Sequence, residues 1–179
     1  AHAGRAWLLV GLAYETKLDK LDKAIEAYRK AEESPLREQA QQRLQAFQAR
    51  QMVLYTEHAF TTAEKPALKA ITRNITALSL RAYPIDLADY FARKHTIAGL
   101  EALDVALIEP DHRWTQKVEP FEEFKLRESA VPLPFTAPGA YVVTCSATAK
   151  GSETPVLEAT TVVLITDLQI VVKSTRRDL

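Results

Sequence analysis

The chain has 179 residues, with 23 Lys and Arg against 23 Asp and Glu, so its formal net charge is zero. A neutral chain does not carry the basic surface that nucleic acids or anionic membranes attract. Its longest uncharged apolar stretch, residues 6–14, is far shorter than the roughly 20 residues that span a bilayer. We therefore expect no nucleic-acid partner and no membrane span.

The first 50 residues are predicted to form helices. They are rich in Ala, Leu, Glu, Gln, Lys and Arg, which favour helix, and they contain only Pro35 of the nine prolines. Apolar residues recur three or four apart in two successive stripes, and again over residues 36–47. Ser34 followed by Pro35 is typical of a helix start, with serine as the cap and proline at the first helical position. We predict three consecutive antiparallel helices.

After residue 50 the pattern changes to short β-rich runs that are separated by prolines and glycines. Residues 140–148 alternate between an apolar and a mostly hydroxylated face, as expected for an antiparallel sandwich with one face of the sheet in the core. Asp86 is predicted to cap a short helix that interrupts the strands. The triplet Asn74-Ile75-Thr76 matches an N-glycosylation acceptor, but we interpret it as a turn between two strands. The predicted strands cover residues 52–57, 68–73, 76–85, 124–128, 140–148, 156–166 and 168–173.

The predicted fold class is α+β in two segregated parts. Residues 1–50 form a helical repeat segment, and residues 51–179 form an all-β sandwich domain with one short inserted helix. No linker rich in glycine, serine or proline separates the parts, because residues 47–53 pass directly from a helical stripe to strand alternation. We therefore expect a stiff junction.

Aromatic, small and proline residues recur at fixed spacings in the helical part, namely Trp7, Gly11, Tyr14, Ala24, Tyr28, Ala31 and Pro35. This spacing resembles one tetratricopeptide unit, which has the pattern Trp-x2-Leu-Gly-x2-Tyr, followed by Ala, an aromatic residue, Ala and Pro. Small residues at this spacing let two antiparallel helices approach closely, and the aromatic residues fill the space around the contact. One unit rarely folds alone, so either further repeats precede it or its helices dock on the sandwich.

Six segments of the second part are informative through their order and spacing, namely residues 64–66, 72–75, 79–91, 133–135, 138–143 and 159–173. Together they resemble the first macroglobulin domain of bacterial alpha-2-macroglobulin-like proteins. The resemblance implies a seven-stranded fibronectin-like sandwich at the amino end of a very large periplasmic or extracellular protein that traps proteases. Many such proteins carry a thioester segment, Cys-Gly-Glu-Gln, which is absent here, so no residue of this chain is assigned the trapping chemistry.

Two groups of residues are candidates for a functional site. Cys145, the only cysteine, lies on the apolar phase of a predicted strand, which is typical of a small buried hydrophobe rather than a nucleophile. His112, Arg113 and Trp114 lie where a solvated surface loop is expected, shortly after Pro110. An exposed Trp and Arg pair is of the kind enriched at binding hot spots, so these three residues form a candidate contact site.

Metal and cofactor sites are not predicted. A single cysteine excludes a zinc site built from several cysteines, and no two of the four histidines are four residues apart. The acid pairs Asp86 with Asp89 and Glu122 with Glu123 do not have the ligand density of a calcium site. We therefore expect no cofactor and no catalytic residue.

These patterns favour a non-enzymatic structural and protein-interaction fragment of a large bacterial alpha-2-macroglobulin-like protease-trapping protein. The resemblance implies a periplasmic or extracellular location, with the remainder of the parent polypeptide, proteases or other proteins as partners. The chain opens Ala-His-Ala-Gly rather than with Met, which we interpret as a processed or excised start. The alternative is a carbohydrate-binding or small-ligand-binding sandwich that uses Trp114, Tyr90 and His112 as a stacking platform.

Overall fold

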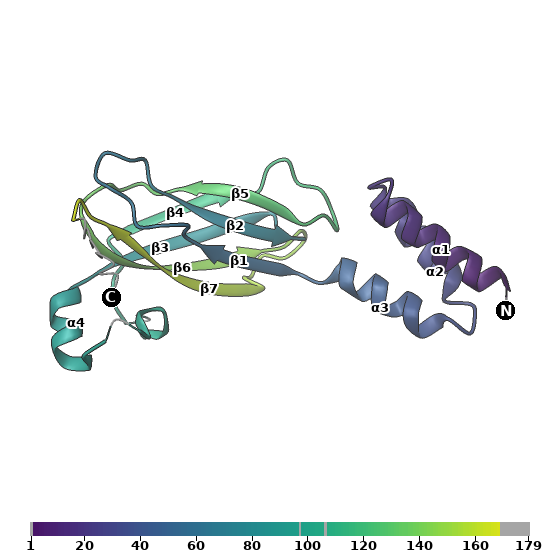
Figure 1. The fold of residues 1–179 in the computed structure, drawn as a ribbon, viewed down its shortest axis with the longest axis horizontal. Coiled ribbons are helices and arrows are strands. Elements are labelled where there is room, and N and C mark those ends of the chain that lie inside the picture. The colour runs from purple at the N-terminus through teal and green to yellow at the C-terminus, as the bar shows by residue number, and fades with distance from the viewer. Residues whose placement is uncertain (1, 97, 106, 169–179) are drawn as a thin grey trace, which may run out of the picture.

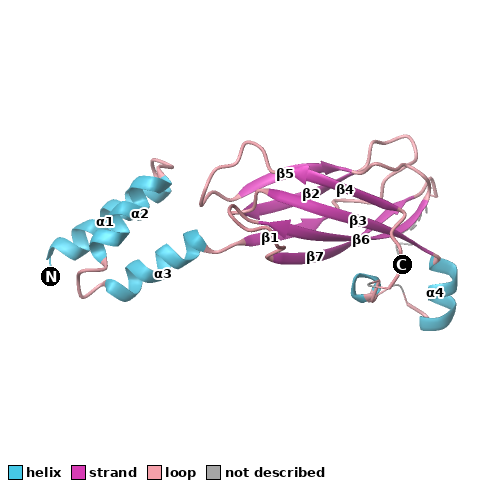
Figure 2. Ribbon diagram, turned by 180° about the vertical axis from the view of Figure 1, so that it is seen from behind, coloured by secondary structure: helices cyan, strands magenta, loops and turns pink. Residues whose placement is uncertain are grey.

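The computed structural model describes residues 2–96, 98–105 and 107–168. The fold is α+β, as predicted, with a helical part followed by a β-sandwich of two antiparallel sheets. The molecule is elongated, and the first three helices occupy one end of the sandwich while the fourth lies at the opposite end (Figure 1). Figure 2 shows the same separation of helices and strands from behind.

Three antiparallel helices form the first part, as predicted, and we call them the helical segment. They are α1 (His2–Thr16), α2 (Leu21–Ala31) and α3 (Arg37–Gln48). The predicted start of the third helix is wrong, because Pro35 lies in the turn before α3. The Ser34 hydroxyl instead closes that turn, since it donates to the Ala31 carbonyl at 2.6 Å and accepts from the Leu36 N–H at 3.2 Å.

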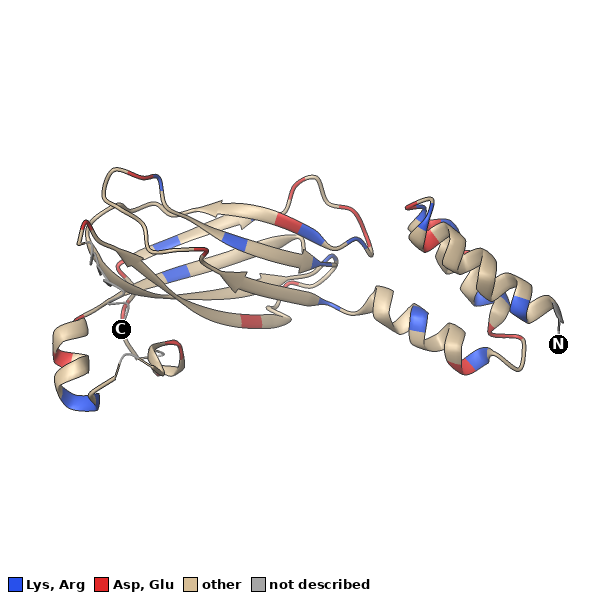
Figure 3. Ribbon diagram, in the orientation of Figure 1, with Lys and Arg blue, Asp and Glu red and all other residues tan. Residues whose placement is uncertain are grey.

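The strands of the described residues form one sheet of three and one of four, with orders β1-β2-β5 and β4-β3-β6-β7. Acidic and basic positions are interspersed along both the helical segment and the sandwich (Figure 3), in keeping with the zero net charge. The strands are β1 (Gln51–Tyr55), β2 (Ala67–Arg73), β3 (Ala77–Ile85), β4 (His112–Lys117), β5 (Arg127–Pro132), β6 (Gly139–Thr148) and β7 (Leu157–Ile165).

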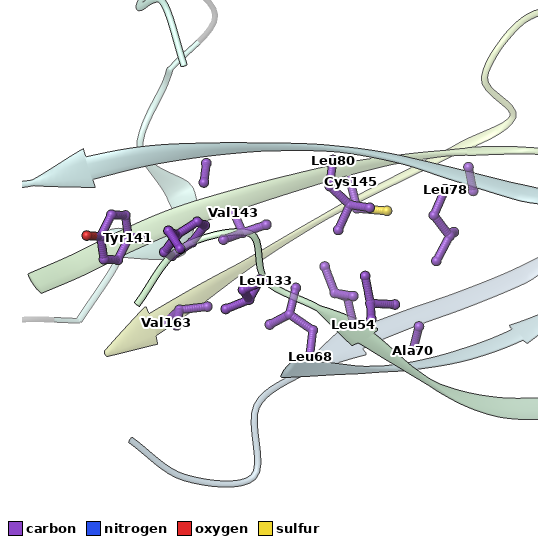
Figure 4. Close-up of a cluster of buried hydrophobic side chains, with 14 of the residues drawn as sticks. Leu54, Leu68, Ala70, Leu78, Leu80, Leu133, Tyr141, Val143, Cys145 and Val163 are labelled. Atoms are coloured by element: carbon purple, nitrogen blue, oxygen red, sulfur yellow. The ribbon is translucent and has the colours of Figure 1, made fainter. Parts of the chain in front are cut away.

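The sandwich encloses one apolar core between its sheets. Leu80 in the central strand β3 lies opposite Cys145 in β6 and Trp114 in β4. Leu68 and Ala70 of β2 point into the same core from the other sheet (Figure 4). Alternate residues of β2 and β3 are buried, because successive side chains of a strand point to opposite faces.

A short helix, α4 (Leu87–Lys94), interrupts the strands, as predicted. Its N-cap is Asp86, whose carboxylate accepts from the Asp89 N–H at 2.9 Å. A 3-10 turn, η1 (Leu100–Ala102), follows it. Val105, after this turn, packs on Tyr83 and Val142, so the inserted segment covers part of the outer surface of the four-stranded sheet.

One loop prediction and the start of one predicted strand are wrong, and another predicted strand falls largely outside the described residues. Residues 112–117 form strand β4 rather than a solvated loop. Every second side chain, at His112, Trp114 and Gln116, is partly buried, and the side chains between them are exposed. Residues 124–126 are not in a strand, and β5 begins at Arg127. In the last predicted strand, residues 169–173 lie outside the described residues, and Leu168 is not in a strand and is 87% exposed.

Candidate functional site: the joint between helices and sandwich

The joint is the region where α3 meets the sandwich, and the side chain of Asn74 lies at its centre. Asn74 is in the turn between β2 and β3, which confirms the predicted turn. Its Nδ2 donates to the carbonyls of Phe47 and Ala49 at 2.7 and 3.1 Å. Its Oδ1 accepts from the backbone N–H of Phe124 at 2.7 Å. The amide thus connects the end of α3 with the loop between β4 and β5, and each of its two polar atoms faces a partner of the required kind.

Arg73 adds a second contact to the same end of α3. Its guanidinium donates to the Ala46 carbonyl at 2.7 Å. The last carbonyls of a helix have no partner within the helix, and a cation there also interacts favourably with the helix dipole. The end of β2 and the turn that follows it therefore provide hydrogen-bond donors for the last carbonyls of α3.

Phe124 carries the apolar part of the joint. It belongs to the loop between β4 and β5, yet it packs against the buried core of the helical segment. Its backbone has φ of 67°, which is unusual for a bulky residue because the left-handed region brings Cβ close to the backbone. The helical core that it contacts consists of Ala24, Ile25, Tyr28, Leu44 and Phe47.

An exposed ion pair lies beside Phe124. The Lys125 ammonium is 2.8 Å from Asp19 in the turn between α1 and α2, and 3.3 Å from Glu122 in its own loop. Hydrogen bonds to Asp19 and Glu122 raise the pKa of Lys125 above its ordinary value. Exposed ion pairs of this kind contribute little to the free energy of unfolding. This pair therefore helps to orient the loop and adds little to the stability of the joint.

Four of the tetratricopeptide-like residues lie in the contact between the helices. Gly11, Ala24, Tyr28 and Ala31 are buried. A Cβ on Gly11 would lie 2.5 Å from the Tyr28 ring, so α1 and α2 can approach this closely only with glycine there. The Tyr28 hydroxyl donates to Glu15 at 2.5 Å, and burial together with this bond raises the pKa of Tyr28.

The other three repeat-like residues lie closer to solvent. Trp7 is 37% exposed, with the Lys30 ammonium 4.3 Å from its ring centroid. Tyr14 is partly buried at the edge of the helical core, and Pro35 is exposed in the turn before α3. Trp7 therefore lies on an outward surface of α1, which also exposes Leu9 and Val10.

The candidate contact site on β4 is divided between the two faces of that strand. The His112 ring stacks on Phe135 at 4.7 Å, and Trp114 meets the same ring edge-on at 6.2 Å. Arg113 points outward and pairs with Glu109 at 3.6 Å. The exposed Trp and Arg pair that we expected is therefore not formed, because Trp114 packs on the sandwich core.

Cys145 has the surroundings of a buried hydrophobe. Its side chain is 1% exposed and lies among the core residues in Figure 4. Burial raises the pKa of its thiol to about 12. A thiol with so high a pKa is protonated at neutral pH and is a poor nucleophile.

The described part of the chain also contains a cavity away from the joint. This cavity of ≈ 260 Å³ lies between the inserted segment and the edge of the sandwich, and its lining includes Leu87, Leu100 and Val162. No group of three or more metal-ligating side chains is found among the described residues. Among the same residues no helix is both long and apolar enough to cross a bilayer.

Sequence reasoning missed the joint. It identified Asn74 as a turn residue, for which asparagine is well suited because it tolerates positive φ, and the observed φ is 57°. The sequence pattern placed Phe124 in a predicted strand, and the alternation of a strand does not indicate a contact with helices. The ion pair of Lys125 with Asp19 joins residues 106 positions apart, which no local pattern can predict.

None of the models of known protein families matches the sequence, and a search of curated proteins finds no match.

Proposed function

We propose that the chain is a non-catalytic scaffold and protein-interaction module, which holds a helical segment at one end of a β-sandwich. The observation that carries this proposal is the joint, where Asn74 and Phe124 fasten the helices to the sandwich through side chains. Contacts of this kind set an orientation between two parts and do not form a reaction centre. The buried, protonated thiol of Cys145 agrees with such a role.

We further propose that the parent is a bacterial alpha-2-macroglobulin-like protease-trapping protein of the periplasm or extracellular space, with the sandwich as a fibronectin-like macroglobulin domain and the helices as a tetratricopeptide-like repeat. The segments that carry the macroglobulin resemblance support this, because most of them fall on strands β2, β3, β6 and β7. The trapping chemistry would belong to other parts of the parent.

The partner that we propose for the helical segment is the remainder of the parent polypeptide. Residues 6–14 of α1 carry no charge, and helices that are apolar all round are normally buried. One side of α1 packs on α2, whereas Trp7, Leu9 and Val10 remain 36–56% exposed. The outward surface of α1 is therefore the part of the segment suited to cover by other protein.

Side-chain footprinting tests this assignment. Hydroxyl radicals should oxidise Trp7 and Leu9 at least several-fold more slowly in the full-length parent than in the isolated chain. Val53, which is 54% exposed on β1, is the internal reference for solvent access. Equal oxidation of Trp7 and Leu9 in both proteins would contradict the proposed partner.

A substrate panel tests the non-catalytic role. We expect no turnover of esters, peptides or glycosides by the chain above the rate in buffer. Turnover that disappears in the Cys145→Ala variant would overturn the proposal. The carbohydrate-binding alternative has less support, because the rings of His112 and Trp114 are packed on Phe135 rather than arranged as a stacking surface.

A further inference from the structure

We propose that the loop between β4 and β5 is a latch, which fixes the angle of the helical segment and changes conformation when that segment undocks. Two residues hold it in place, namely Phe124 in the loop itself and Asn74 in the neighbouring turn between β2 and β3. The inference deepens the proposed scaffold function and rests on it, because a fixed angle matters in a module that positions other protein.

The covalent connection alone does not fix the angle. Only Ala49 and Arg50 separate α3 from β1, and Ala49 has an extended backbone. Rotation about these two residues would swing the helices as a unit. The turn between β2 and β3 and the loop between β4 and β5 supply two further attachments, so the helical segment is held from three places on the sandwich.

Both holding residues have left-handed backbones, and this couples the loop to the helices. Asparagine tolerates such a conformation, whereas phenylalanine rarely adopts it without compensation. Two contacts compensate Phe124, namely its ring in the helical core and its N–H bond to Asn74. Undocking the helices removes the ring contact, and the loop is then free to relax to an ordinary backbone.

Asn74 makes the coupling direct. One amide group binds the end of α3 through Nδ2 and the backbone of Phe124 through Oδ1. Movement of either partner leaves a polar atom of the amide without its bond, so α3 and the loop keep or lose their positions together. A protein that pulls on the helical segment would therefore alter the loop, and one that binds the loop would alter the helical angle.

Distance measurement between spin labels tests the latch. Labels at Gln42→Cys in α3 and Ser79→Cys in β3 use exposed positions on the two parts, and the buried Cys145 should not react with the label. The otherwise unchanged chain should give one narrow distance distribution. A broad distribution in that protein would overturn the latch, whereas the substrate panel described above decides the non-catalytic function separately.

Two variants at Asn74 separate its backbone from its hydrogen bonds. Asn74→Gly keeps the left-handed backbone available but removes all three bonds, and it should at least double the width of the distribution. Asn74→Asp keeps an acceptor for the Phe124 N–H but turns an oxygen toward the carbonyls of α3, so it should also broaden the distribution. His95→Gly is the matched control, because His95 has φ of 55° at the end of α4, away from the joint, and should leave the width unchanged.

Hydrogen exchange at the Phe124 amide gives the second readout. Loss of its acceptor in Asn74→Gly should speed this exchange at least tenfold, while amides in β3 and β6 keep their protection. If Asn74→Gly does not fold, Phe124→Ala replaces it and should broaden the label distances in the same way. An unchanged narrow distribution in a folded Asn74→Gly or Phe124→Ala protein would overturn the latch.

Discussion

The sandwich and the helical segment bury very different amounts of apolar side chain. In the described residues, eighteen buried side chains form the sandwich core, and all of them come from the sandwich itself. The helical core has five buried side chains and takes a further contact from Phe124 of the sandwich. Small cores seldom supply enough free energy to order a chain by themselves. The sandwich is therefore expected to fold without the helices, while the helices depend on the sandwich.

This dependence explains how the helical segment is ordered in this chain despite its small core. Helical repeats normally complete their cores by stacking on neighbouring repeats. Here the C-terminal end of α3 and the helical core both obtain contacts from the sandwich, through Asn74 and Phe124. The helices are therefore docked on the sandwich, and this docking completes their core.

The largest effect is expected from a truncation in the sandwich core. Leu80→Ala removes a side chain that is 1% exposed and should lower the free energy of unfolding by about 2–5 kcal/mol. Because the helices depend on the sandwich, both parts should lose structure together in urea. Val53→Ala on the exposed surface of β1 is the control and should cost under about 0.5 kcal/mol. Helices that stay folded after the sandwich has unfolded would contradict their dependence on the sandwich.

Alkaline pH should destabilise both parts through raised pKa values. The thiol of Cys145 has a pKa of about 12 in the folded chain against an ordinary 9.0. Its stabilising contribution is therefore complete below pH 9 and is lost as pH rises toward 12, at about 1.4 kcal/mol per pH unit. Tyr28 acts in the same direction in the helical segment, because its pKa is also raised.

Urea titrations of the chain and of Cys145→Ala at pH 8 and pH 11 measure the thiol contribution. The variant should lose about 2–3 kcal/mol less than the unchanged chain over this interval. Equal losses in both proteins would show that the thiol ionises without cost and would argue against its burial.

A smaller and more local effect is expected at the joint. Phe124→Ala should lower the stability of the helical segment by about 1–2 kcal/mol, since a partly buried contact is lost and alanine, which keeps Cβ, does not relieve the left-handed backbone. Hydrogen exchange should become faster in α2 and α3 and remain unchanged in β3 and β6. Faster exchange in the sandwich strands would contradict the one-sided dependence.

The smallest effect is expected on the outward surface of α1. Trp7→Ala removes a ring that is 37% exposed and a cation–π contact with Lys30. Such exposed contacts contribute about 0.5–1 kcal/mol, so the change in unfolding free energy should stay near that size. Thermal unfolding measures it, and a loss above about 2 kcal/mol would place Trp7 in the helical core instead.

Local patterns predicted the parts of the fold that local interactions decide. Apolar periodicity identified the three helices, and Asp86 identified the start of α4 because its cap bond spans three residues. Strand β4 was missed because Pro110 and the charged residues near it resemble a loop, although the alternation of His112, Trp114 and Gln116 was present in the sequence. The joint could not be predicted from local patterns, because Asn74 and Phe124 are 50 positions apart in the chain.

Residual dipolar couplings test most directly whether the two parts form one body. Backbone N–H couplings from α1–α3 and from the seven described strands should fit a single alignment tensor, with the same magnitude for both sets. Two tensors of clearly different magnitude would contradict the account, because the helical segment would then move independently of the sandwich.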